Sequence, residues 1–524
     1  MSFDEKDTTI TPANSPMTVD PEKENPEINT MSEETKKASK TSFLGDSPLL
    51  YTMWILTYPD LVEKLAEAAY SVVDSMFIGN LAGDTEEERN AALASISYAT
   101  PLVQGLIFGI CLFYSIGSGA MYSRSLGKGC LEDAKSVIYN FFILCLCTGI
   151  IIPFVYWGIS NPLLRLLGAS EKTNTLQSSQ IYFIIISSGI LFYIFSIGGS
   201  TIIRNEGSAL FSACILITGF IVNIVLDPLL IGIAKMGVTG AAIATISGYG
   251  LSALCCLFYF ILKKSAVTLK FKEIRPHWKL MKPVLNIGIS GFCSAFSTAV
   301  LNSVTNRLIL YYSPYGSDSI ETTEAIAVSG AIGKITYFCF LPMLSISTGM
   351  MPILSYCRGA KLYTRHMNCM KVAFLCSITL ALLLTIIGFF SAEYIGKAFG
   401  GSEGFLNVFT PAMRYVTSGL VFCPFVLIMY PTLQCCGYGI TAAILIVCKQ
   451  CVFYIVIQVI VCEIRHDYWG CFIAYPISDF LSAILGIIVF FCYRKDLDGS
   501  KDRQKDYHRA SSIQDETHID TVLK

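Results

Sequence analysis

The chain is dominated by about twelve apolar segments, each of a length that can cross a lipid bilayer. A membrane-spanning helix needs about 20 mostly apolar residues. The segments run approximately over residues 59–82, 92–120, 134–158, 176–201, 208–233, 239–262, 283–312, 324–355, 370–392, 409–434, 439–462 and 469–493. This pattern predicts an all-α integral membrane protein with about twelve transmembrane helices.

The composition agrees with a protein that crosses the membrane many times. Hydrophobic residues make up 53% of the chain and charged residues 15%, and the mean hydropathy is +0.56. Soluble domains are nearer a quarter charged. The net charge is −1 and the basic residues are spread among loops, so we expect no nucleic-acid partner. Most of the 20 cysteines fall inside apolar segments, where they act as small hydrophobes.

Two polar tails flank the apolar region. Residues 1–45 are rich in Glu, Lys, Thr, Ser and Pro, and residues 494–524 are similar, so we expect both tails to be disordered. The N-terminal tail has no secretory signal peptide. Residues 49–58 are apolar but too short to span a bilayer, and we interpret them as an interfacial segment that leads into the first helix.

The distribution of basic residues predicts the orientation. The loop over residues 263–282 holds seven Lys and Arg residues, whereas residues 84–88 and 313–324 are acidic or neutral. Cytoplasmic loops carry the excess of Lys and Arg, so both termini are predicted to be cytoplasmic. We expect a monomer in the plasma membrane, although the sequence does not distinguish this membrane from that of an internal vesicle.

The chain contains an internal repeat, because one constant offset in residue number superposes its first half on its second. The offset pairs Ser115 with Ser345, Gly119 with Gly349, Ser125 with Ser355, Gly129 with Gly359 and Gly207 with Gly437. Because this offset spans six helices, the halves have the same topology. Such parallel repeats indicate two six-helix bundles related by a pseudo-twofold axis along the membrane normal. We assign residues 46–262 and 283–493 to the bundles and 263–282 to a cytoplasmic basic linker.

One apolar segment contains a carboxylate that needs an explanation. Asp227 lies within it, and an Asp at the centre of a membrane helix costs about 2.5 to 3.5 kcal/mol on insertion scales, so such a residue marks an ion or substrate path. Asn223 is four residues earlier and shares its helix face. Pro228 cannot donate a backbone hydrogen bond, so a helix that continues through it leaves the Ile224 carbonyl without a partner.

The first helix carries a polar stripe. Glu63, Glu67, Tyr70 and Asp74 are spaced by four, three and four residues and share one face, and Lys64 is placed to pair with Glu63 or Glu67 or to snorkel. Two carboxylates in one water-poor cavity resist ionising together, so a proton could bind and leave near physiological pH. A sodium ion bound by the oxygen atoms of Asn223 and Asp227 is the alternative.

The second half differs in its charges. Its segments hold fewer acids, of which Asp479 is the clearest, and Arg307, Lys334, Arg414 and Lys449 lie near or within them. The repeat places Phe453 and Ile457 at the positions of Asn223 and Asp227. The ion chemistry is therefore predicted to be confined to the first half.

Several stretches together resemble the MATE (multidrug and toxic compound extrusion) transporters, and most closely their DinF-like prokaryotic-type branch. The resemblance is carried by Tyr70-Ser71-Val72-Val73-Asp74-Ser75-Met76-Phe77-Ile78-Gly79, Gly117-Ser118-Gly119-Ala120, Ser125 to Gly129, Ile203-Arg204-Asn205-Glu206-Gly207, residues 223–228 and residues 236–245. The second half matches more loosely at residues 341–360.

The resemblance implies a secondary active exporter of small amphipathic, usually cationic drugs, which uses inward-moving protons or sodium by alternating access and needs no cofactor. The coupling roles of the DinF-like branch fall on Tyr70, Asp74, Asn223, Asp227 and Thr245. Pro59 matches a proline linked to helix bending, and Pro228 is a second candidate for bending. Glu67 departs from the pattern of the branch and is a possible additional titrating group, and Cys357 stands where Asn is common.

Three other functions were weighed. An intramembrane enzyme would need a His, a nucleophile with its base, or metal ligands within the membrane, and His277, His366, His466, His508 and His518 all fall in predicted loops or tails. Residues 126–129 lack the Gly and the Ser or Thr of a phosphate loop, so an ATP-driven pump is not supported. A flippase of the wider superfamily that moves a lipid-linked substrate remains the alternative within transporters.

Overall fold

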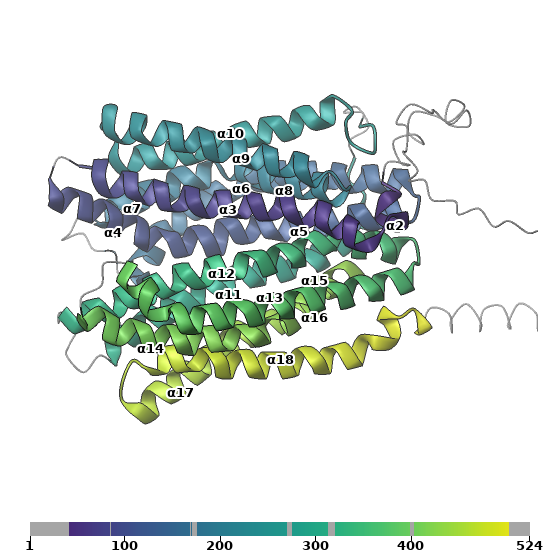
Figure 1. Cartoon of the computed structure of the whole chain (residues 1–524). Coiled ribbons are helices and arrows are strands. Elements are labelled where there is room, and N and C mark those ends of the chain that lie inside the picture. The colour runs from purple at the N-terminus through teal and green to yellow at the C-terminus, as the bar shows by residue number, and fades with distance from the viewer. Residues whose placement is uncertain are drawn as a thin grey trace, which may run out of the picture.

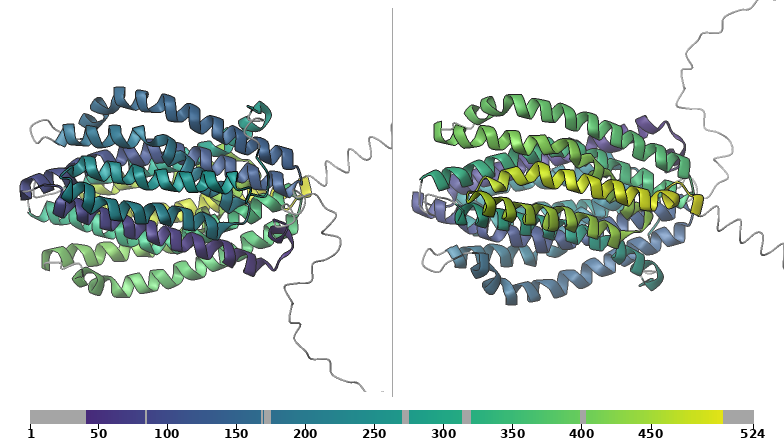
Figure 2. Two further views of the ribbon diagram at one scale, coloured as in Figure 1. Left: turned by 90° about the horizontal axis from the view of Figure 1, so that it is seen from above. Right: turned by 90° about the horizontal axis from the view of Figure 1, so that it is seen from below.

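The computed structural model describes residues 41–501 apart from residues 84, 168, 170–174, 270–274, 313–319 and 399–402. The described residues form helices and loops and contain no β-strand. The helices lie roughly parallel and form two bundles side by side, one from each half of the chain (Figure 1). Views from above and below show the same division (Figure 2). The predicted all-α architecture with two bundles is confirmed.

The first bundle is built from helices that are broken by proline, glycine or a π-helical turn. They are α2 (Phe43–Asp46), α3 (Leu49–Leu81), α4 (Glu86–Leu102), the π-helical η2 (Val103–Phe108), α5 (Gly109–Gly127), α6 (Leu131–Leu167), α7 (Thr175–Ser188), α8 (Ile190–Asn205), α9 (Ala209–Asp227), the π-helical η3 (Pro228–Ile233) and α10 (Gly237–Ile261).

The second bundle repeats this plan. It contains α11 (Trp278–Tyr311), α12 (Ile320–Gly359), α13 (Tyr363–Ala398), α14 (Glu403–Gly419), the 3₁₀ turn η5 (Leu420–Phe422), α15 (Cys423–Cys436), α16 (Gly439–Val447), the π-helical η6 (Cys448–Ile455), α17 (Val456–Arg465) and α18 (Gly470–Leu497).

The predicted number of membrane spans agrees with these helices. Among the described residues, ten helical stretches are long and apolar enough to cross a membrane, and α7 with α8, which meet at 53°, make an eleventh. The 33 residues of α3 span about 50 Å, so its length suffices for a twelfth. Helix α3 is not among the helices that are apolar enough to cross a membrane, because charged residues such as Asp60, Glu63 and Lys64 interrupt its apolar stretch.

The repeat is visible at equivalent helix ends. Gly207 follows α8 with a φ of 101°, and Gly437 follows α15 with a φ of 90°. Both conformations are left-handed, which favours glycine because it has no Cβ. The two positions are one of the pairs that the repeat in the sequence predicts.

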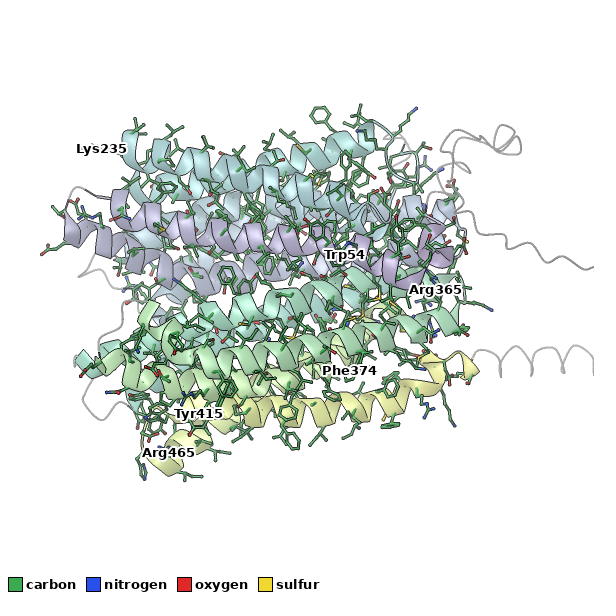
Figure 3. The ribbon with its side chains drawn as sticks, in the orientation of Figure 1. Trp54, Lys235, Arg365, Phe374, Tyr415 and Arg465 are labelled. Carbon is green, nitrogen blue, oxygen red and sulfur yellow. The ribbon has the colours of Figure 1, made fainter. Side chains whose placement is uncertain are left out.

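The two bundles pack closely at the end of the molecule where α5 and α12 finish and α11 begins, which we call the basic end. A Cβ on Gly127 would lie 2.1 Å from the carbonyl oxygen of Tyr356, and a Cβ on Gly359 would lie 2.1 Å from that of Arg124. Ser123 donates a hydrogen bond to the carbonyl of Pro352 over 2.9 Å. Arg365 lies near this end, whereas Lys235 and Arg465 lie at the other (Figure 3).

The structure differs from the sequence-based boundaries in four places. Residues 49–58 are the first three turns of α3 rather than a separate interfacial segment. Helix α2 begins inside the predicted N-terminal tail and buries Leu44, while α18 extends to Leu497. The last part of the predicted linker, from Trp278, is already helical. The rest of both tails lies outside the described residues.

A further difference concerns His366, which was predicted to lie in a loop. It is fully buried in the first turn of α13, with its Nδ1 atom 3.3 Å from the carbonyl oxygen of Leu354 and its Nε2 atom 3.8 Å from Cys436 Sγ. The prediction was wrong because the start of α13 is polar in sequence, and only packing against α12 and α15 buries it. All described cysteines are free thiols.

Candidate ion-coupling site

The site begins where the regular part of α9 ends. Asp227 is the last residue of α9 and its side chain is fully buried. Pro228 starts the π-helical turn η3, in which Ala234 bonds to the carbonyl of Leu229, five residues earlier. The helix therefore continues through the proline in a widened form. Such π turns are frequent at functional sites.

Asn223 connects Asp227 to the neighbouring helix α10. In the amide orientation that satisfies both neighbours, Asn223 Nδ2 donates to Asp227 Oδ2 over 3.0 Å and its oxygen accepts from the backbone N–H of Thr245 over 3.0 Å. The Thr245 hydroxyl donates to the carbonyl of Ala241. The close approach of α9 and α10 depends on glycine, because a Cβ on Gly248 would lie 2.5 Å from the Gly219 carbonyl oxygen.

Helix α3 brings the second carboxylate to this group. The side chain of Asp74 lies close enough to interact with that of Asp227, and the Tyr70 hydroxyl lies close to Thr245. The Tyr70 ring stacks on Phe220 with their centroids 5.3 Å apart. Two ionised carboxylates at close range repel each other, which favours a proton held between them. One oxygen of each acid is buried without a hydrogen-bond partner in the described part of the chain.

The sequence-predicted site residues are thus brought together. A small pocket beside them is lined by Tyr70, Gly219, Phe220, Asn223, Thr245, Gly248, Tyr249 and Ser252. Hydroxyl and amide side chains surround this pocket, but the surface that they leave open is apolar. The residues that the structure describes contain no cluster of three or more His, Cys, Asp and Glu side chains that could hold a metal ion.

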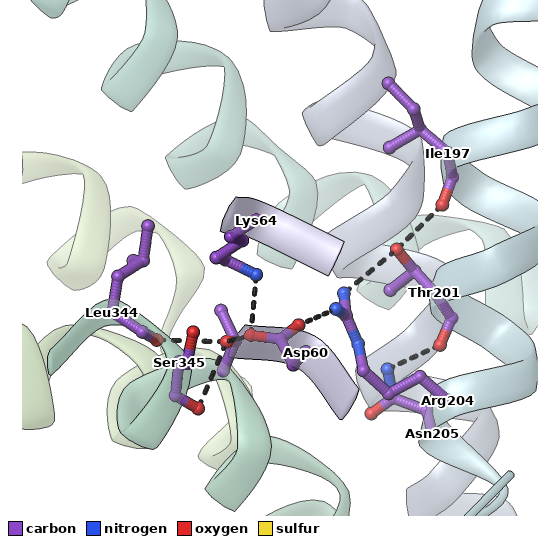
Figure 4. A network of polar contacts seen from close by, with 9 residues as sticks. Asp60, Lys64, Ile197, Thr201, Arg204, Asn205, Leu344 and Ser345 are labelled. Atoms are coloured by element: carbon purple, nitrogen blue, oxygen red, sulfur yellow. Dashed lines mark hydrogen bonds and ion pairs between the residues drawn. The ribbon is translucent and has the colours of Figure 1, made fainter. Parts of the chain in front are cut away.

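A second polar network lies on α3, nearer the basic end (Figure 4). Asp60 is fully buried beside Pro59 and forms ion pairs with Lys64 Nζ, at 2.6 Å, and with Arg204 on α8. The hydroxyl of Thr348 on α12 donates to the same carboxylate over 2.5 Å. Asp60 therefore joins three helices, one of which belongs to the other bundle.

This network corrects the sequence-based pairing of Lys64, whose partner is Asp60 and neither Glu63 nor Glu67. Glu63 is buried too, so the start of the polar stripe is not a solvated helix entrance. Along α3, Glu67 lies between this network and Asp74. Lys64 is close enough to Glu67 to attract its carboxylate electrostatically. Pro59 lies inside a helix that continues through it.

Comparison with known proteins identifies the family. The profile of the MatE family matches residues 59–229 and 293–460, one stretch in each bundle. The chain belongs to the MatE family. The multidrug export protein MepA of Staphylococcus aureus is 24% identical over 322 residues, which cover 61% of this chain and 67% of MepA. MepA of Staphylococcus saprophyticus is 23% identical over 415 residues, 78% of this chain and 86% of that protein.

Solved structures agree with this assignment at the level of the fold. A crystal structure of a MATE protein in complex with MaD3S is 20% identical, has a TM-score of 0.78 and covers 88% of this chain and 99% of its own. MatE proteins are transporters and not enzymes, so the intramembrane enzyme weighed from the sequence is excluded for this chain.

In the second bundle of this MatE protein, an ion pair lies at the position that corresponds, by the internal repeat, to the pocket of the first bundle. Lys449 Nζ, in the π-helical turn η6, lies 2.9 Å from Asp479 on α18, and both side chains are largely buried. In the repeat the two residues correspond to Gly219 and Tyr249. Both charges are evident in the sequence of the second half, but their pairing is not. The internal repeat could have indicated this pairing, because it places Lys449 and Asp479 at the positions of two residues that line the pocket of the first bundle.

Proposed function

We propose that this chain exports small amphipathic cations across the membrane, in exchange for inward-moving protons or sodium ions, by alternating access. The observation that supports the coupling role best is the buried contact between Asp74 and Asp227. It joins two helices, is completed by Asn223 and Thr245, and adjoins a small pocket. Two carboxylates in such a site can hold a proton between them, or they can release it and bind a cation instead.

Two observations favour a cationic and amphipathic substrate. The stripe on α3 holds three acids, Glu63, Glu67 and Asp74, which form no ion pair with another described residue, whereas the neighbouring Asp60 is paired with Lys64 and Arg204. The relatives in two Staphylococcus species are multidrug export proteins. A flippase for lipid-linked substrates would instead be favoured by a strongly cationic central cavity that opens laterally to lipid. The acids of α3 lie at the proposed coupling site, and the cationic cavity between the bundles lies apart from it at the basic end. We further propose that the protein acts as a monomer in the plasma membrane with both termini cytoplasmic.

The experiment is transport of a fluorescent cation such as ethidium into or out of liposomes that contain the purified full chain. Proton and sodium gradients are imposed separately. We expect one of them to drive transport, and we expect Asp74→Asn and Asp227→Asn each to abolish it because a neutral amide cannot exchange a proton or balance a cation. Glu132→Gln is the matched control, since Glu132 is an exposed carboxylate of the same bundle that pairs with Lys135.

Gradient-dependent transport that persists in both Asp variants would refute the coupling assignment. Glu67→Gln then tests the departure from the family pattern. A changed pH optimum of transport would make Glu67 an additional titrating group, whereas an unchanged optimum would leave it as a partner of the Asp60 network.

A further inference from the structure

A cavity at the basic end lies apart from the proposed ion-coupling site. It has a volume of about 450 Å³ and lies between the bundles, with α5 of the first bundle on one side and α11 and α15 of the second on the other. Its lining residues are Met121, Arg124, Trp278, Lys279, Lys282, Pro283, Asn286, Ile287, Cys436 and Gly437. This volume falls within the usual range of small-molecule sites.

The charge of the cavity is strongly positive. Arg124, Lys279 and Lys282 line it, and its lining includes no carboxylate. None of the three cations forms an ion pair with a residue in the described part of the chain. Arg124 Nε is buried and lacks a hydrogen-bond partner among these residues. A buried guanidinium N–H without an acceptor is costly, which indicates that an anion completes this site.

The walls of the cavity are rigid. A Cβ on Gly117 would lie 2.1 Å from the Val284 carbonyl oxygen, so α5 and α11 are in backbone contact beside it. Asn286 Nδ2 donates to the carbonyl of Gly437 over 3.2 Å and fixes the end of α15. The backbone positions of the three cations are therefore fixed, while Lys279 and Lys282 keep exposed side chains that can adjust to a ligand.

We propose that this cavity binds a phosphate group, supplied by the headgroup of an anionic phospholipid or by a free phosphate. The planar guanidinium of Arg124 matches phosphate oxygens in pairs, while the lysines add charge. Basic pockets between transmembrane helices suit such headgroups. Arg124 comes from the first bundle and the lysines from the second, so the ligand stabilises the arrangement in which the bundles meet at this end.

Native mass spectrometry of the full chain in nanodiscs tests the proposal. The nanodiscs contain phosphatidylcholine with a minor fraction of phosphatidylinositol 4-phosphate. We expect retention of one anionic lipid, and retention weaker by about 25-fold in Lys279→Gln/Lys282→Gln, taking about fivefold for each lysine. Lys371→Gln/Lys495→Gln is the matched control, since it removes two exposed lysines near the same end outside the cavity.

A second arm separates the two sources of the phosphate group. Inorganic phosphate is added to the protein in nanodiscs of phosphatidylcholine alone, and its binding is measured by calorimetry. Saturable binding that Lys282→Glu abolishes identifies a free phosphate, and lipid retention without it identifies the headgroup. The proposal is overturned if neither ligand binds, or if the cavity and control variants lose the same fraction of it. An unchanged melting temperature of each variant confirms that it is folded.

Discussion

At the scale of single residues, the pair formed by Lys449 and Asp479 shows how a buried charge constrains the second bundle. Breaking a buried ion pair leaves an uncompensated charge, which costs about 3 to 5 kcal/mol. We therefore expect Lys449→Met to lower the free energy of unfolding by about this amount, measured by thermal unfolding in detergent. Asp479 also lies against Gly419, 2.9 Å from where a Cβ would be, which leaves little room for it to move to water.

The control for this prediction is the double variant Lys449→Met/Asp479→Asn. Without the carboxylate no unpaired charge remains, so the double variant should recover most of the stability that the single variant loses. Equal melting temperatures of the single and double variants would show that the two side chains do not form a charged pair in the folded protein.

The sequence predicts the site acids better than their partners. Asp74 and Asp227 stand out because an acid in an apolar run is costly, and spacing along each helix identifies Tyr70 and Asn223 as neighbours on the same face. Asp60 was missed although Lys64 is four residues along the same helix; its second cation, Arg204, is 144 residues away on another helix. Partners that tertiary packing supplies leave no periodic signal within one segment.

At the scale of helices, α5 and α11 cross in direct backbone contact. A Cβ on Gly288 would lie 2.0 Å from the Phe113 carbonyl oxygen. Because backbone atoms cannot move aside as a flexible side chain does, Gly288→Ala should force the helices apart and destabilise the protein by about 1 to 3 kcal/mol or more. The measurement is the melting temperature of the purified variant.

Gly250→Ala on α10 is the matched control, since nothing lies within 4 Å of the Cβ that it would add. Alanine is the better helix former, so this variant should be neutral or more stable by about 0.5 to 1 kcal/mol. Equal destabilisation by both substitutions would mean that helix propensity, and not the crossing, determines the effect.

Helix existence and order were predictable because twenty-residue apolar runs are unambiguous, but local geometry was not. A proline within an apolar run indicates a disturbed helix, and the sequence alone does not show that α9 passes through Pro228 in a π turn. Likewise, residues 49–58 are too short to span by themselves. Their continuity with α3 depends on burial of Met53, Leu56 and Pro59 against neighbouring helices.

At the scale of the whole molecule, the two bundles meet through few polar contacts, which suits bodies that separate and return. Across the basic end, Asp60 accepts from Thr348 and Ser123 donates to the carbonyl of Pro352. Within the first bundle, by contrast, Glu206 accepts hydrogen bonds from Tyr122, Tyr259, Ser265 and the backbone N–H of Ala266. Alternating access requires the first kind of contact to break during transport while the second persists.

A cysteine at position 123 can report this separation. Ser123 is fully buried between the bundles, whereas Ser196 is fully buried within the first bundle, where its carbonyl accepts from Ser200. If the bundles rock as rigid bodies, Ser123→Cys should be protected from N-ethylmaleimide at rest and react several-fold faster when substrate and an ion gradient drive turnover. Ser196→Cys should stay protected in both states. Mass spectrometry of the corresponding peptides distinguishes these positions from the native cysteines, and equal rates at position 123 with and without turnover would contradict opening at the basic end.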